Sequence, residues 1–265
     1  MKKNFLISLT ISIILSAVFV FVNAQSPISP LKSSVEKKEK YTLTAFAPSQ
    51  KFKDASILDW NYINGKFNFD IGGKSYKLGE QTLDAPQKMC ANSKEGQHLH
   101  IIIDNEPYLA KYTNSFDLDI LDGKHYLLSF LSRSYHESIK TKKAHRLTKI
   151  LVKGKNIVSQ EPVKEKMIFY SRPKGTYIGD DTKKVMLDFY LANVKLGKKY
   201  KVKAEINGEV HVIDNWQPYT IEGLPMGKNL ITLTLIDKDG RAVNSPMNPV
   251  TREFELKPDP LPSKN

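Results

Sequence analysis

The histidines are the residues in this sequence best suited to chemistry. His98 and His100 stand two positions apart in the run GQHLHIII. On an extended strand such residues project from the same face, so the two imidazoles can present their nitrogens to one Zn or Cu ion. His125, His136 and Asp104 are the candidates for a third ligand. The alternative interpretation is that the histidines are ordinary polar residues on an exposed strand face.

A second cluster lies in the stretch LLSFLSRSYHESIK (127–140). Arg133, His136 and Lys140 occur there among serines, and such groups hold phosphate or carboxylate through charge-assisted hydrogen bonds. Forkhead-associated domains read phosphothreonine with a Ser-x-x-His pattern, but Arg133 occupies the position of that serine here. The stretch therefore indicates either a small anion-binding site or simply the polar end of a strand.

Two aromatic residues mark a third candidate, a loop with the sequence IDNWQPY. Trp216 and Tyr219 could stack on a sugar ring or on a partner protein if the loop is exposed. The alternative is that the tryptophan closes the edge of a hydrophobic core. The sequence contains no Gly-x-Ser-x-Gly, no His-Glu-x-x-His, no phosphate loop and no dinucleotide fingerprint. We therefore expect no enzymatic activity, and no cofactor other than Zn or Cu.

Short strands must position these residues. Runs such as YTLTAFA, HLHIIID, KVMLDFYL and NLITLTLID alternate with period two and are separated by turns such as Asn-Gly and Asp-Gly. This pattern predicts an all-β fold, with two tandem immunoglobulin-like β-sandwich domains. We place them at 41–157 and 165–257, with a linker at 158–164 where the sequence SQEPVKEK interrupts the pattern.

The two segments follow one plan, which supports a duplication. Each has a strand, a tight turn, a further strand, a Gly-Lys loop and an apolar strand. Ile103 corresponds to Ile206 and Gly123 to Gly227, with offsets of about 103.

The same offset pairs His98 and His100 with Lys201 and Lys203 of the row KKYKVKAEI. A row of lysines faces solvent. The duplication therefore predicts that the two histidines also point outward into solvent.

The N-terminal segment has the layout of an export signal. Lys2 and Lys3 precede an apolar run over 5–22, and small residues follow it. We expect a signal peptide at 1–24 that is cleaved after Ala24, and a periplasmic or extracellular location. The alternative is an uncleaved anchor in the inner membrane through residues 5–22. Residues 25–40 and 258–265, rich in Ser, Pro and Lys, are expected to be a flexible linker and tail.

Composition limits the partners. The net charge is +12, and one cysteine, Cys90, excludes an internal disulfide. The excess of lysine indicates a solvated basic surface and is compatible with an anionic envelope component, a phosphorylated ligand or a protein partner. We expect no nucleic-acid partner for an exported protein, and membrane contact only through the N-terminal segment if it is not cleaved.

Four runs carry a family resemblance: GQHLHIIIDNEPY, DGKHYLLSFLSRSYHESIK, FYSRPKGTYIGDDTKKVMLDFYLAN and IDNWQPYTIEGLPMGKN. With them the chain resembles a group of uncharacterised exported bacterial two-domain β-sandwich proteins. Some members of that group carry an automatic label of phosphopeptide binding, which implies a phosphorylated ligand.

Three functions follow from these observations. The first is an exported, non-enzymatic binding or envelope-associated interaction protein. The second is a periplasmic Zn- or Cu-binding protein that uses the histidines of the first domain. The third is a phosphate- or phosphopeptide-binding module.

Overall fold

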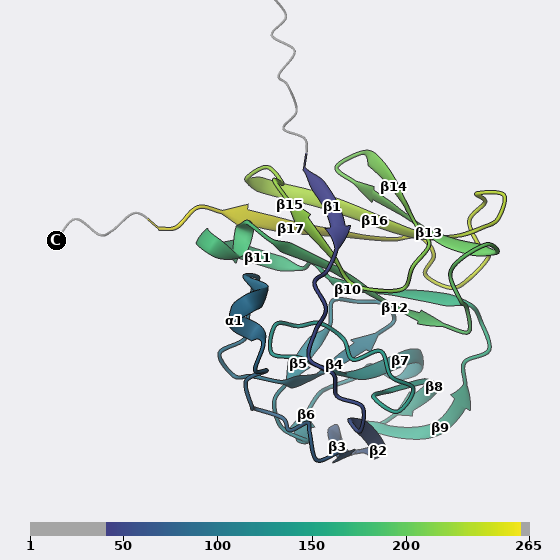
Figure 1. Ribbon diagram of the computed structural model, residues 1–265. Coiled ribbons are helices and arrows are strands. Elements are labelled where there is room, and N and C mark those ends of the chain that lie inside the picture. The colour runs from purple at the N-terminus through teal and green to yellow at the C-terminus, as the bar shows by residue number, and fades with distance from the viewer. Residues whose placement is uncertain (1–40, 261–265) are drawn as a thin grey trace, which may run out of the picture. The chain divides into compact units, whose positions relative to one another are not determined.

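The computed structural model describes residues 41–260 of the chain (Figure 1). These residues form strands, one short helix, α1 (Ala85–Lys88), and one 3₁₀ turn, η1 (Gly179–Thr182). The strands assemble into four sheets that make two β-sandwiches in tandem. The prediction of an all-β fold of tandem sandwiches is confirmed.

The N-terminal sandwich consists of a three-stranded and a five-stranded sheet, with strand orders β2-β3-β6 and β5-β4-β7-β8-β9. Tyr62, Phe67, Leu99, Ile101 and Leu127 are among the buried residues of the core between them. The strands are β2 (Ser56–Ile63), β3 (Lys66–Gly72), β4 (His98–Ile103), β5 (Leu109–Lys111), β6 (Ser115–Asp117), β7 (Gly123–Ser132), β8 (His145–Lys153) and β9 (Asn156–Pro162).

The C-terminal sandwich consists of a four-stranded and a five-stranded sheet, with strand orders β1-β15-β12-β10 and β11-β17-β16-β13-β14. Its core includes Ile168, Phe189, Val202, Leu233 and Phe254. The strands are β1 (Thr42–Ala45), β10 (Met167–Arg172), β11 (Gly175–Ile178), β12 (Val185–Ala192), β13 (Tyr200–Ile206), β14 (Glu209–Ile213), β15 (Tyr219–Glu222), β16 (Gly227–Asp237) and β17 (Val250–Lys257).

Two strands lie elsewhere than the sequence analysis puts them. Strand β1 precedes the N-terminal sandwich in sequence but pairs with β15, and Figure 1 shows it, in purple, among the strands of the C-terminal sandwich. Strand β9 occupies most of the stretch 158–164 that we assigned to a linker, because its backbone continues the ladder of β8. The second half of β9 is exposed and consists of polar residues and a proline, which gives it the composition of a linker.

The duplication is visible in the sheets. Strands β4 and β13 hold the same place in their five-stranded sheets, and so do β7 and β16. Strand β4 ends at Ile103 and β13 at Ile206, while β7 begins at Gly123 and β16 at Gly227. These are the pairs that the sequence comparison matched.

The two sandwiches pack against each other through a separate apolar cluster. Ile102, Leu128 and Phe130 project from the outer face of β4 and β7, and they meet Phe169 and Tyr190 on β10 and β12. Both faces of β4 and β12 are consequently covered, and almost every residue of these strands is buried. The outer face of β4 is thus an interior surface.

Hydrogen bonds of the Asn105 side chain stabilise this contact. Its side-chain nitrogen donates to the carbonyl of Ile168 at 2.9 Å, and its oxygen accepts from the amide of Tyr170 at 2.8 Å. Asn105 is buried and has a φ of +60°, a conformation that asparagine tolerates better than most residues.

We expect Asn105→Ala to lower the free energy of unfolding by about 2 kcal/mol, because two buried backbone groups lose their partners. Denaturant titration of both proteins measures this difference. Asn64→Ala is the matched control, since Asn64 also has a positive φ but lies exposed in a turn. Equal losses in the two variants would mean that the positive φ, and not the two hydrogen bonds of the Asn105 side chain, accounts for the effect.

No helix among residues 41–260 is long and apolar enough to cross a membrane. The signal peptide or anchor at 1–24 and the linker at 25–40 lie outside the described residues, as does the end of the tail at 261–265.

Candidate functional site

His98, His100 and His136 meet in one place. One ring nitrogen from each lies within 4.8 Å of the others. The Nε2 atoms of His98 and His100 are 2.7 Å apart, and Nδ1 of His136 is 3.0 Å from Nε2 of His98. Three of the four histidines that the sequence nominated as metal ligands therefore form a cluster, which we call the three-histidine cluster.

Strand β4 provides two members of the cluster but does not expose them. His98 and His100 have no solvent-accessible surface, so the prediction that they face solvent is wrong. They do point away from the core of their own sandwich, on the same face as Ile102. The C-terminal sandwich covers that face, whereas Lys201 and Lys203, their counterparts on β13, remain partly exposed.

A loop provides the third member. His136 lies four residues beyond the end of β7 and has a φ of +68°. The left-handed region costs a non-glycine residue roughly 1–2 kcal/mol, and such conformations persist where the surrounding structure holds them. Here the amide of His136 donates to the carbonyl of Arg133 at 2.9 Å, which closes a tight turn. This turn directs the ring toward β4.

Hydrogen bonds orient the ring of His98. Its Nδ1 lies 2.8 Å from the carbonyl oxygen of Gly96. A carbonyl can only accept, so Nδ1 carries the proton and Nε2 presents its lone pair to the cluster. A backbone carbonyl in this position is the usual support of a metal-binding imidazole. Nδ1 of His100, in contrast, is buried without a partner, which is costly in a folded protein.

All three rings are neutral at physiological pH. Burial lowers the pKa of His98 to about 4, and it lowers the pKa of His100 and His136 well below the usual value. The positive charge of Arg172 acts in the same direction on each of them. Neutral imidazole is the form that binds metal ions, so the cluster needs no change of charge to act as a ligand set.

Tyr108 borders the cluster and connects it to the C-terminal sandwich. Its ring stacks on His100 with centroids 3.7 Å apart, and its hydroxyl is 3.4 Å from Nδ1 of His136. Nη1 of Arg172 donates to that hydroxyl at 2.6 Å, and Nζ of Lys174 lies 4.1 Å from the ring centroid. Tyr108 was not among the predicted site residues, although it stands in the same run as the two histidines, GQHLHIIIDNEPY.

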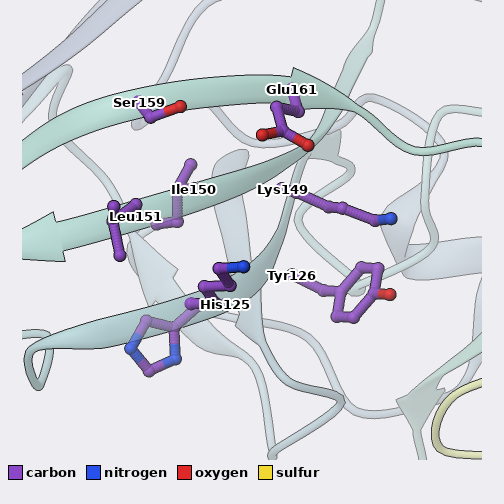
Figure 2. Close-up of a pocket in the computed structure, with 8 residues that line it drawn as sticks. His125, Tyr126, Lys149, Ile150, Leu151, Ser159 and Glu161 are labelled. Atoms are coloured by element: carbon purple, nitrogen blue, oxygen red, sulfur yellow. The ribbon is translucent and has the colours of Figure 1, made fainter.

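His125 is not part of the cluster. Its Nδ1 pairs with Asp104 at 2.6 Å, and its Nε2 lies 2.8 Å from the carbonyl of Leu121. It lines a separate cavity of about 270 Å³ over β7, β8 and β9, next to Tyr126 and Lys149 (Figure 2). Asp104, the other candidate third ligand, is therefore committed to His125.

Two of the three proposed anion-binding residues, Arg133 and Lys140, line one cavity of about 350 Å³ together with Lys51 and Lys53. Arg133 donates through Nε to the carbonyl of Gln50 at 3.0 Å, and its Nη1 is 3.5 Å from the Glu137 carboxylate. Lys140 forms an ion pair with the buried Asp188. His136 turns to the three-histidine cluster. Arg133 and Lys140 thus each have a carboxylate partner within the protein, and phosphate binding at this cavity stays a prediction.

The aromatic loop lies against the body of the protein. Trp216 is half-buried, donates through its indole nitrogen to the carbonyl of Phe189 at 3.0 Å, and packs edge-on against Tyr190. The hydroxyl of Tyr219 donates to the carbonyl of Asn215 at 3.0 Å. Trp216 thus packs against both the core of the C-terminal sandwich and the contact between the sandwiches.

No protein-family model and no curated protein sequence matches this chain. Solved structures that resemble it include the fibronectin(III)-like modules of Clostridium thermocellum CbhA, at 19% identity over 36% of this chain and 100% of that one, with a TM-score of 0.28. The central fibronectin-III array of RIM-binding protein matches at 10% identity over 81% and 72% of the two chains, with a TM-score of 0.26. Domains 4 and 5 of the S-layer protein SbsC match at 11% identity over 82% and 98%, with a TM-score of 0.21. With TM-scores this low, function has to be argued from the chain's own residues.

Proposed function

We propose that this protein is an exported, non-enzymatic metal-binding protein that holds one Zn or Cu ion at His98, His100 and His136. The observation that carries the proposal is the convergence of three neutral imidazole nitrogens within 4.8 Å. Zn and Cu are among the ions for which imidazole is a preferred ligand.

The cluster requires only a small adjustment to receive an ion. Zn–N bonds of about 2.0–2.1 Å in a tetrahedral site put the ligand nitrogens about 3.4 Å apart. The nitrogens of His98 and His100 are now 2.7 Å apart, and those of His98 and His136 are 3.0 Å apart. In this arrangement an N–H of His100 or His136 points at the lone pair of His98. Moving that proton to the other nitrogen of its ring frees the third lone pair without changing the charge of the protein.

Burial favours binding over catalysis. His98 and His100 are inaccessible to solvent, and the C-terminal sandwich closes the face from which they project. Structural metal sites are closed in this way, whereas catalytic sites keep a coordination position open to substrate. The export signal at 1–24 supports a periplasmic or extracellular location, where the protein would buffer a metal ion or use it to join its two sandwiches.

Metal titration tests the proposal. We expect the metal-free protein to bind about one Zn(II) or Cu(II) ion, and His98→Ala/His100→Ala to weaken binding at least 100-fold, because two of three ligands are lost. Isothermal titration calorimetry against a competing chelator measures both affinities. His125→Ala is the matched control, since His125 pairs with Asp104 outside the cluster, and it should bind as the wild type does. Equally weak binding by all three proteins would refute the metal site.

A further inference from the structure

The three-histidine cluster is surrounded by positive charge and contains no acid. Arg172 is buried, Lys174 is partly buried, and neither forms an ion pair with a carboxylate in the part of the chain that the structure describes. Three neutral imidazoles add no negative charge. Asp181 interacts with Arg172 electrostatically but does not contact it as an ion pair. A divalent cation placed here would add to a buried positive charge that no carboxylate contacts directly, which is unfavourable unless an anionic ligand accompanies the ion.

One side chain at the cluster can supply that ligand. The hydroxyl oxygen of Tyr108 lies 3.4 Å from Nδ1 of His136, which is about the separation of two ligands in a tetrahedral site. The stacking on His100 holds the tyrosine ring in place. Nη1 of Arg172 donates to the same oxygen at 2.6 Å, and a donated hydrogen bond stabilises negative charge on the oxygen that accepts it.

On the basis of the proposed function, we infer that the phenolic oxygen of Tyr108 is the fourth ligand of the metal ion. Coordination breaks the O–H bond, forms a metal–oxygen bond and gives the proton to water. The resulting site has three imidazole nitrogens and one phenolate oxygen, with Arg172 positioning the oxygen from the C-terminal sandwich. A phenolate is a hard ligand, so the site selects Zn(II) or Cu(II) and disfavours Cu(I), which prefers sulfur.

This ligand set also makes the metal ion a link between the sandwiches. The three histidines and Tyr108 belong to the N-terminal sandwich and its loops, whereas Arg172 lies at the end of β10. Metal binding would place charge on the oxygen that Arg172 holds and so strengthen a hydrogen bond across the contact.

The Cu(II) form gives a direct test. We expect the wild-type Cu(II) complex to show visible absorption from phenolate-to-copper charge transfer, and Tyr108→Phe to lose this band and bind Cu(II) at least tenfold more weakly. Tyr112→Phe is the matched control. The ring of Tyr112 also lies against His98, at 5.0 Å, but its hydroxyl is bonded to Ser93 Oγ at 2.7 Å, so this variant should keep the band.

The outcomes separate the two proposals. A wild-type protein that binds neither Cu(II) nor Zn(II) contradicts the metal site itself. A wild-type protein that binds Cu(II) without the band, and with unchanged affinity in Tyr108→Phe, leaves the metal site standing and overturns the role of Tyr108. An affinity that instead rises with added chloride or formate would identify an external anion as the fourth ligand and would equally overturn that role. Circular dichroism of the metal-free variants verifies that each is folded.

Discussion

Asp188→Ala is expected to lower the free energy of unfolding by about 3–5 kcal/mol, because it breaks a buried ion pair from one side. Asp188, on β12, is fully buried and forms the pair with Lys140 of the N-terminal sandwich. One carboxylate oxygen of Asp188 also accepts from the amide of Ser138 at 3.0 Å and from its hydroxyl at 2.6 Å. The substitution leaves a mostly buried ammonium without its carboxylate and a buried amide without its acceptor at the contact between the sandwiches.

A double-mutant cycle with Lys140→Met isolates the pair. Removing both charges eliminates the uncompensated ion. The double variant should therefore lose clearly less free energy of unfolding than the two single variants lose together. Asp180→Ala serves as the matched control, because Asp180 pairs with Lys183 on the surface and its loss should not be measurable. Urea unfolding of the four proteins gives the coupling energy. Strict additivity would show that Asp188 and Lys140 contribute independently.

The strands that carry the site could be predicted from the sequence because the fold is repeated. The alternating runs indicated the strand positions, and the match of Ile103 with Ile206 and of Gly123 with Gly227 indicated that both sandwiches follow one plan. The place of β1 could not be predicted in this way. It depends on pairing with β15, about 177 residues further along the chain, and no local pattern encodes such a partner.

The orientation of the histidines was predicted wrongly, although one neighbouring residue in the sequence indicated that they are buried. Ile102 shares a face with His98 and His100, whereas the corresponding face of β13 carries Lys201, Lys203 and Glu205. An apolar residue on the supposed solvent face indicates that something covers it. Equating the two repeats hid this difference, because duplicated domains keep their cores while their outer faces diverge.

The selection among third ligands depended on loop geometry. His125 and His136 are equally plausible by sequence, and only the left-handed conformation of His136 directs its ring to β4. The partners of the cations in the stretch 127–140 could not be predicted from the sequence either. Asp188, the partner of Lys140, lies 48 residues away along the chain.

Acid should destabilise the metal-free protein through the buried histidines. The pKa of His98 is about 4 in the folded protein, against about 6.5 in an unfolded chain. The folded state therefore binds fewer protons between these values, and stability falls as the pH falls through this window. The contribution of His98 is fully present above pH of about 6.5, and about 3 kcal/mol of it is lost by pH of about 4. His100 and His136 act in the same direction.

Comparison with His98→Gln isolates this contribution from the carboxylates, which titrate in both proteins. Glutamine cannot be protonated in this range, so the variant should lose less stability on acidification, and the difference between the two curves should grow from pH 7 to pH 4. Urea unfolding at several pH values, with a chelator present to remove metal, gives both curves. Two parallel curves would mean that His98 takes up its proton as readily in the folded protein as in the unfolded chain. Such a histidine would have to be in contact with solvent, and the closed, neutral cluster at the contact between the sandwiches would have to be abandoned.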